Sequence, residues 1–328
     1  MAPSPTSAPR SPAPSIGVDL GGTSMRVAVV DAANEVLWRG RRSSQSLDQQ
    51  QLLDALAEEI SLGIDEHPEV AAVGLGIPCT IDQHRGLAIS AVNLPIHDLP
   101  IRDEMGDRLG LPVVIDNDAN AAAYGEFVAG AGRDSRHLVM ATVGTGIGGG
   151  VVVDGRVQRG SYGAGGELGH TVIEVDGPPC QGTCPNRGCV EVMASGTALA
   201  EEGLRLAKGS PDSALGRHLA DGRAITGRVV VEAAVAGDEP AKRLMARIGR
   251  RLGTAMASWA NIFDPDVIVL GGGVVAGAGA LLIDPAREEL RARALPPMNQ
   301  AAVTGSSLGE EAGTIGAAAL AATGIAAT

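Results

Sequence analysis

Two stretches of this chain share one pattern: residues 16–40 are IGVDLGGTSMRVAVVDAANEVLWRG, and residues 138–160 are LVMATVGTGIGGGVVVDGRVQRG. In each, an apolar run leads into a Gly/Thr turn, a β-branched run, an Asp-containing polar turn and a third short strand. Strand-like composition follows the glycines directly, so each stretch predicts a β-hairpin. A Rossmann fingerprint or a P-loop needs a helix directly after its glycines, so the pattern excludes both.

The segments around these stretches predict the helices and strands of an α/β protein. Apolar periodicity indicates an amphipathic helix over residues 48–65, and apolar runs indicate buried strands at 70–78 and 111–116. The strand at 111–116 leads into a helix at 118–128. After the cysteine-rich segment the chain becomes mostly helical, with one long helix predicted over 240–261.

This organisation predicts a duplicated α/β fold. Each half contains strand–Gly–strand units with attached helices, and we expect a cleft between the two lobes. The predicted boundary lies near residue 130, with a smaller N-terminal lobe at 16–130 and a larger C-terminal lobe at 131–328. The last helix is expected to return to the first lobe. Residues 1–15 consist mainly of Pro, Ser and Ala, which predicts a disordered tail.

Composition narrows the class of protein. The 328 residues carry a formal net charge of −12, from 38 acidic and 26 basic residues, which disfavours nucleic acid and anionic membrane as partners. The tail has no leucine-rich segment of the kind found in signal peptides. The Ala-rich end after Gly313 is too short to span a bilayer. We therefore expect a soluble, cytoplasmic protein.

The glycine turns of the two repeated stretches fit phosphate binding. Turns without side chains expose backbone N–H groups that, with a Thr hydroxyl, hold phosphate oxygens, and an Asp beside them reaches phosphate-bound Mg²⁺. One such turn alone is equally an ordinary hairpin turn. Two copies facing one cleft predict a nucleotide clamp, formed by Asp19, Gly21, Gly22 and Thr23 in the first stretch and Thr142, Gly144, Thr145 and Gly146 in the second.

The segment DNDAN, residues 116–120, lies where a predicted strand ends and a helix begins. Asn and Asp are preferred helix caps, but capping needs only one of the four polar residues. Sites of α/β proteins lie at the carboxyl ends of strands. At such a place Asp118 can accept the proton of a substrate hydroxyl that attacks phosphorus, and Asn117 can bind sugar hydroxyls.

Three of the four cysteines lie between residues 180 and 189. Thiolates prefer zinc, and one imidazole would complete a Cys₃His tetrahedron. Disulfides or scattered core thiols are the alternative. The short, Gly-rich spacings and the lack of any sign of an oxidising compartment favour zinc. The predicted ligands are His170, Cys180, Cys184 and Cys189. The carboxylates of Glu167 and Glu191 flank them and suit hydroxyl-rich ligands.

Together, the two turns, DNDAN, GELGH and PNRGCVE resemble the ROK family of bacterial sugar kinases, which belongs to the superfamily of hexokinase and actin. The resemblance runs from about residue 16 to about residue 320. It implies two ribonuclease-H-like (actin-like ATPase) lobes with an interlobe cleft, Mg·ATP as phosphate donor, a structural zinc ion and Asp118 as general base. It further implies a sugar site made of Asn93, Asn117, Asp118, Glu167, His170 and Glu191, and an adenosine-side turn made of Gly271, Gly272 and Gly273.

The resemblance also assigns detailed roles. His170 would place one ring nitrogen on zinc and the other on a sugar hydroxyl, and Glu191 is expected to affect sugar binding while leaving ATP binding nearly unchanged. Two departures stand out. The gap between Cys180 and Cys184 holds three residues where the family commonly has one, which predicts a longer loop. Ser24 stands where many members carry lysine.

The sequence around DNDAN most resembles the glucokinases of the family, which implies phosphorylation of D-glucose at O6. The resemblance also implies a homodimer or higher homo-oligomer. Kinases for mannose, fructose or N-acetylmannosamine, and a glucokinase that uses polyphosphate, are the alternatives. The rival from another class is a sugar-responsive repressor or sensor of the same family. Repressors carry a DNA-binding winged helix before the sugar-binding part, and we expect none in the fifteen residues before Ile16.

Overall fold

The computed structural model describes residues 13–326 except Val92 and Thr183. Most of the predicted tail at 1–15 therefore lies outside the described residues. The described chain divides into two compact units: the first unit holds 13–129, 161–164 and 311–326, and the second unit holds 130–160 and 165–310. The chain passes from the first unit to the second after Ala129, and the last helix belongs to the first unit.

The first unit is built on a five-stranded sheet of order β3-β2-β1-β4-β8. Strands β1 (Ser15–Leu20) and β2 (Ser24–Val30) form an antiparallel hairpin, and β3 (Val36–Ser43) continues it antiparallel. On the other side of β1, strands β4 (Ala72–Ile77) and β8 (Val113–Asn117) add in parallel. The carboxyl ends of β1, β4 and β8 therefore meet at one edge.

A small antiparallel sheet of order β5-β6-β7 belongs to the same unit. Its strands are β5 (Cys79–Asp82), β6 (Leu87–Ala91) and β7 (His97–Leu99). The sequence did not predict this sheet, because its strands are three to five residues long and lack a sustained apolar period.

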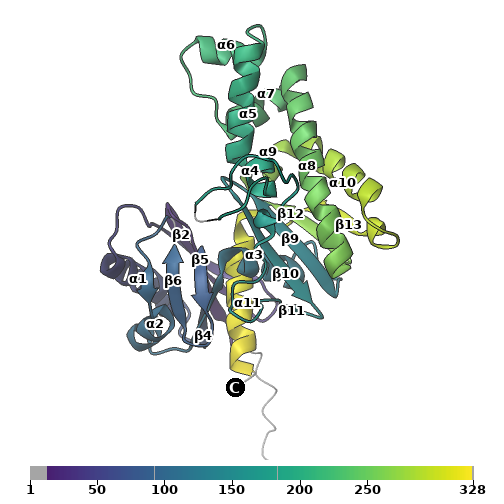
Figure 1. Ribbon diagram of the computed structural model, residues 1–328. Coiled ribbons are helices and arrows are strands. Elements are labelled where there is room, and N and C mark those ends of the chain that lie inside the picture. The colour runs from purple at the N-terminus through teal and green to yellow at the C-terminus, as the bar shows by residue number, and fades with distance from the viewer. Residues whose placement is uncertain (1–12, 92, 183, 327–328) are drawn as a thin grey trace, which may run out of the picture. The chain divides into compact units, whose positions relative to one another are not determined.

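Different kinds of side chain pack on the two faces of the first sheet. Helices α1 (Gln49–Glu66) and α2 (Ile101–Leu109) supply Leu, Ile and Met side chains to one core. Helix α11 (Ala312–Ala326) contacts α3 (Asp118–Val128) and lies on β1 and β4 (Figure 1, yellow). Its backbone approaches so closely that a Cβ at Gly17 would overlap the carbonyl oxygen of Thr314.

The second unit repeats the first sheet strand for strand, in the order β11-β10-β9-β12-β13. Strands β9 (His137–Val143) and β10 (Ile147–Val153) form the second predicted hairpin, with β11 (Arg156–Val157) antiparallel to β10. Strands β12 (Val267–Gly271) and β13 (Ala302–Gly305) add in parallel. The shared order confirms the predicted duplicated α/β fold.

Helices form most of the rest of the second unit. Figure 1 shows α8 beside α10, and their contact is extensive. The long predicted helix is α8, which begins after the cap Asp238 and ends at Asp264 in a left-handed conformation, directly before Pro265. The helices are α4 (Val190–Ala194), α5 (Gly196–Gly209), α6 (Ala214–Ala220), α7 (Gly227–Val235), α8 (Glu239–Phe263), α9 (Gly273–Ala278) and α10 (Ala280–Arg293).

The described residues also form three single-turn 3₁₀ helices: η1 (Leu168–His170), η2 (Met298–Gln300) and η3 (Gly309–Glu311). Over the described part of the chain, no helix combines the length and the apolar character that crossing a membrane requires.

Candidate functional site

Acidic residues gather at the carboxyl edge of the first sheet. Parallel register pairs Asp19 on β1 with Gly76 on β4, and Gly76 with Asp116 on β8. Asp118 follows as the first residue of α3, and its Cα lies 3.5 Å from the position that a Cβ on Gly76 would take. This is the edge at which α/β proteins place their sites, and glycine leaves room at its centre.

The polar residues of DNDAN divide between structure and chemistry. Asn117 caps α3: its Oδ1 accepts hydrogen bonds from the N–H groups of Ala119 (2.9 Å) and Asn120 (3.3 Å). Buried Asp116 accepts from the Asn117 N–H (2.8 Å) and from Nδ2 of Asn120 (3.0 Å). The strand-to-helix turn is thus fixed by its neighbours, and half-buried Asp118 begins the helix where the backbone dipoles favour a carboxylate.

The first glycine turn joins β1 to β2. The Gly21 N–H donates to the Ser24 carbonyl (3.0 Å), and Ser44, just after β3, donates its hydroxyl to the Gly21 carbonyl (2.6 Å) and its N–H to the Thr23 carbonyl (3.2 Å). A Cβ on Gly22 would lie 2.9 Å from Cβ of Asn93, so the exposed Asn93 lies against this turn. The structure therefore brings Asn93 beside the first predicted phosphate turn, and Val92 of the same motif lies outside the described residues.

Asp19 lies two residues before Gly21 of that turn and pairs with Arg26 on the neighbouring strand. Arg26 Nη1 lies 3.1 Å from Asp19 Oδ2, and both side chains are partly exposed. The guanidinium orients the carboxylate beside the turn.

The second glycine turn joins β9 to β10 and is held by two helices. The Gly196 N–H donates to the Gly144 carbonyl (2.8 Å), and Thr197 donates its hydroxyl to the Thr145 carbonyl (2.9 Å). Both donors lie at the N-terminus of α5. The N–H of Ile147 donates to Oε2 of Glu191, in the first turn of α4, at 2.9 Å.

A cavity of about 910 Å³ opens beside the second turn, within the second unit. Its volume falls in the range of small-molecule and cofactor sites. Of the predicted nucleotide residues, Gly144, Thr145 and Gly273 line it. The other lining residues are Gly196, Thr197, Ala200, Ile225, Thr226, Gly227, Arg228, Val231, Glu232, Val235, Val274 and Gly277.

Gly272, in the predicted adenosine-side turn, has a structural role. Gly272 has φ +87°, and a Cβ there would crowd the backbone of Val143, so glycine lets the β12–α9 turn pass close to β9. Sequence reasoning missed the lining residues between 196 and 235. Their only local signals were helix caps at Ser195 and Thr226, which mark helix starts and not a cavity.

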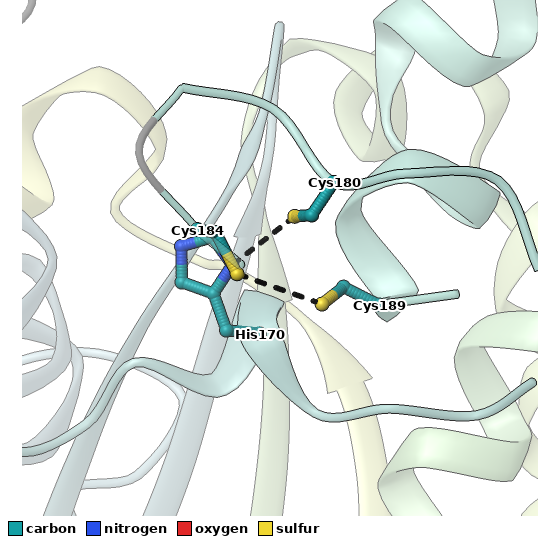
Figure 2. Close-up of side chains that lie close together, drawn as sticks. All are labelled: His170, Cys180, Cys184 and Cys189. Atoms are coloured by element: carbon teal, nitrogen blue, oxygen red, sulfur yellow. Dashed lines mark hydrogen bonds between the residues drawn. The ribbon is translucent and has the colours of Figure 1, made fainter. Parts of the chain in front are cut away.

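Four side chains in the second unit form a candidate metal site. Figure 2 shows His170, Cys180, Cys184 and Cys189 pointing toward one another. His170 Nδ1 lies 3.4 Å from Cys180 Sγ, Cys184 Sγ lies 4.0 Å from Cys189 Sγ, and all four ligand atoms lie within 4.8 Å of one another. Zinc–sulfur bonds of about 2.3 Å in a tetrahedron separate the sulfurs by about 3.8 Å. The donor set and its dimensions therefore fit a zinc ion.

The four cysteines are free thiols, so the disulfide alternative is wrong. Burial raises the pKa of Cys189 to about 12 and also raises the pKa of Cys180, whereas a backbone N–H of Asn186 lowers the pKa of Cys184. Three neighbouring thiolates need a cation to stabilise them, which a divalent metal supplies. In the longer loop predicted before Cys184, Thr183 lies outside the described residues.

The predicted sugar residues of this unit adjoin the metal cluster. Besides facing Cys180 with Nδ1, His170 turns Nε2 toward Glu167 Oε2, 3.9 Å away. Cys189 is the N-cap of α4, so Glu191 stands two residues after a metal ligand. A metal ion here would fix the orientation of His170 and the start of α4 together.

Comparison with known proteins gives a consistent assignment. The ROK family model matches residues 15–323. The chain is 37% identical over 319 residues to a glucokinase of Thermotoga maritima, across 93% of this chain and 96% of that protein. Its fold matches a ROK glucokinase of Streptomyces griseus, crystallised with glucose and AMPPNP, at TM-score 0.81 and 34% identity, covering 94% and 99% of the two chains.

A second kind of protein is also similar. A ROK family transcriptional regulator, a homologue of the E. coli MLC protein, matches at TM-score 0.84 and 28% identity, covering 94% of this chain and 78% of the regulator. Kinases and regulators thus share this fold, and the family model covers nearly the whole sequence. The chain belongs to the ROK family.

Proposed function

We propose that the chain is an ATP-dependent hexokinase that transfers the γ-phosphoryl group to the 6-hydroxyl of D-glucose. The observation that carries the proposal is the position of Asp118, a half-buried carboxylate that directly follows β8 at the carboxyl edge of the first sheet. Two residues before it, Asp116 is in register through Gly76 with Asp19, which lies just before the first predicted phosphate turn. A sugar sensor has no need of a base at this edge. The similarity to glucokinases over nearly the full chain supports the same activity.

Asp118 acts as the general base. The N-terminus of α3 favours its ionised form, and the carboxylate accepts the proton of the 6-hydroxyl while that oxygen bonds to the γ-phosphorus and the bond to the ADP oxygen breaks. Phosphoryl transfer depends mainly on positioning and charge stabilisation, so a weak base suffices.

The other sugar hydroxyls are held by polar side chains. Glu167, the Nε2 edge of His170 and the second carboxylate oxygen of Glu191 accept or donate at the C1 and C2 side of the ring. Asn93 also contacts the sugar. The Oδ1 atom of Asn117 is engaged in the helix cap, so its contribution comes from the amide nitrogen.

The nucleotide occupies the cavity beside the second turn. Gly144 and Thr145 lie at its phosphate end, and Ile225, Val231 and Val235 offer apolar contact to the base. Asp19 would bind the hydrated Mg²⁺ that accompanies ATP, which neutralises charge on the phosphates. Zinc in the Cys₃His site would be structural, because four protein ligands leave no open position for a water nucleophile. The homodimer expected from the resemblance remains a prediction, as does the cytoplasmic location.

The test is kcat/KM for glucose, mannose, fructose and N-acetylmannosamine, with ATP and with polyphosphate as donors. Glucose with ATP should lead by at least about tenfold, which needs only roughly 1.4 kcal/mol of differential transition-state binding. Mannose should have the second-highest kcat/KM, because it keeps the C2 hydroxyl but points it in a different direction. A clear preference for N-acetylmannosamine would overturn the substrate, and sugar binding without turnover on any donor would overturn the kinase in favour of a sensor.

A further inference from the structure

The carboxylate of Glu191 lies against the second glycine turn. Its Oε2 atom accepts the Ile147 N–H at 2.9 Å, and a Cβ on Gly146 would overlap the same oxygen. The two partners are 44 positions apart in the sequence. The side chain expected to bind sugar therefore also touches the loop expected to bind phosphate.

The backbone that carries Glu191 is firmly held. Cys189 and Val190 are fully buried. The backbone of Cys189 forms an isolated antiparallel β-bridge with Val172, and the Val190 N–H donates to the Thr171 carbonyl at 2.8 Å. Thr171 in turn accepts a hydrogen bond at its hydroxyl from Nε1 of buried Trp259, at 2.9 Å. The start of α4 thus presents the Glu191 carboxylate from a fixed base.

The same turn is constrained on its other side by the segment that contains His170. A Cβ on Gly169 would overlap the carbonyl oxygen of Ile147, so the η1 backbone lies directly on β10. Ile147 is therefore fixed at its N–H by Glu191 and at its carbonyl side by η1. These two contacts set where the 144–146 turn leaves β9 and enters β10.

We propose that Glu191 is a positioning residue for the phosphate donor as well as a ligand for the sugar. One carboxylate oxygen holds the Ile147 amide in a charge-assisted hydrogen bond and so fixes the turn, while the other oxygen accepts a sugar hydroxyl. The two substrates then share one side chain, and each strengthens the binding of the other by the same factor. The inference rests on the proposed function, because it assigns the turn to the donor.

Two substitutions separate the two roles of this carboxylate. Glu191→Ala removes both, whereas Glu191→Gln keeps an amide oxygen that can accept the Ile147 N–H but loses the charged acceptor for sugar. Titration with Mg·AMPPNP in the absence of sugar should show affinity about tenfold weaker in Glu191→Ala, or roughly 1.4 kcal/mol. Glu191→Gln should stay within about threefold of wild type, because its hydrogen bond is neutral but retained.

Glu167→Ala is the matched control. It should weaken glucose binding like both Glu191 variants and leave AMPPNP affinity unchanged, because among the described residues no hydrogen bond or ion pair joins the Glu167 side chain to the 144–146 turn. A mutual effect of the substrates is measured by repeating the AMPPNP titration with saturating glucose. The gain in affinity seen in wild type should disappear in Glu191→Ala.

Hydrogen exchange tests the contact itself. The Ile147 amide should exchange faster in Glu191→Ala and at the wild-type rate in Glu191→Gln. Equal AMPPNP affinity in wild type and Glu191→Ala, with unchanged exchange at Ile147, would overturn the inference and leave the kinase proposal intact. Failure of the wild-type protein to bind AMPPNP at all would instead overturn the proposed function, together with the donor role of Glu191.

Discussion

The two glycine turns occupy equivalent places in two sheets of the same strand order, yet different partners hold them. The first turn is braced by Ser44, which directly follows the strand next to the hairpin. The second is braced by the N-terminus of α5 and by Glu191, beside the metal ligands. Duplication preserved the hairpin but not its supports, so a change at the metal cluster should reach the second turn and leave the first unaltered.

The helical packing of the two units, in contrast, shares one feature. In the first unit the backbone of α11 rests on Gly17 of β1, in a contact made of small residues. In the second unit α8 approaches α10 in the same way, because Cβ atoms on Gly249 and Gly253 of α8 would overlap backbone carbonyl oxygens of α10. Both units therefore depend on close backbone approach at glycines, and the second also buries large apolar side chains, among them fully buried Trp259.

The largest expected effect separates chemistry in the first unit from nucleotide binding in the second. Asp118→Asn keeps the size of the side chain and leaves the Asn117 cap in place. We expect kcat to fall by about 10²–10⁴-fold, because the general base is lost. The affinity for AMPPNP, measured by titration, should not change. Retention of more than a tenth of the activity would remove Asp118 from its proposed role.

The next effect sharpens the contrast between the two turns. Cys184→Ser should lose zinc, measured by metal analysis, because a structural site needs all four ligands. Glucose affinity should fall by at least about tenfold. Exchange of backbone amides should rise in the metal-binding segment and around the second turn, and stay unchanged around the first turn. Cys79→Ser, outside the cluster, is the control and should keep one zinc per chain. Three freely titratable thiols at residues 180, 184 and 189 in the active enzyme would contradict this account.

The smallest effect tests the close packing of α11. In Gly17→Ala the new methyl group meets backbone atoms, so the helix must shift, at an expected cost of about 1–3 kcal/mol in the free energy of unfolding. Gly209→Ala at the end of α5 is the control, because nothing lies within 4 Å of its added Cβ, and it should be neutral or slightly stabilising. Equal melting temperatures for both variants would show that α11 is not tightly seated.

Local patterns predicted much of this molecule. Each hairpin follows from a β-branched run directly after glycines, and α3 begins at Asp118 because DNDAN ends a strand and caps a helix. The four metal ligands came from spacing and ligand chemistry, and the structure brings them together. These features lie within short segments, where sequence carries the information.

Other features depend on segments that meet only after folding. The cavity is lined by the start of α5, by residues along the whole of α7 and by α9. The local sequence signals at α5 and α7 are no more than helix caps. The sequence suggested that Glu191 serves the sugar alone. Its contact with Ile147 arises because η1 and α4 both pack at the start of β10, which no local pattern reveals.

The most direct measurement of the central claim is product formation by purified protein with D-glucose and Mg·ATP. We expect glucose 6-phosphate and ADP to appear in equal amounts, at a rate that Asp118→Asn reduces by about 10²–10⁴-fold. Calorimetry on the same sample should show that both proteins bind glucose. If the wild-type protein bound glucose tightly but formed ADP no faster than Asp118→Asn does, the result would contradict the account. It would assign the chain to the sugar sensors of its family.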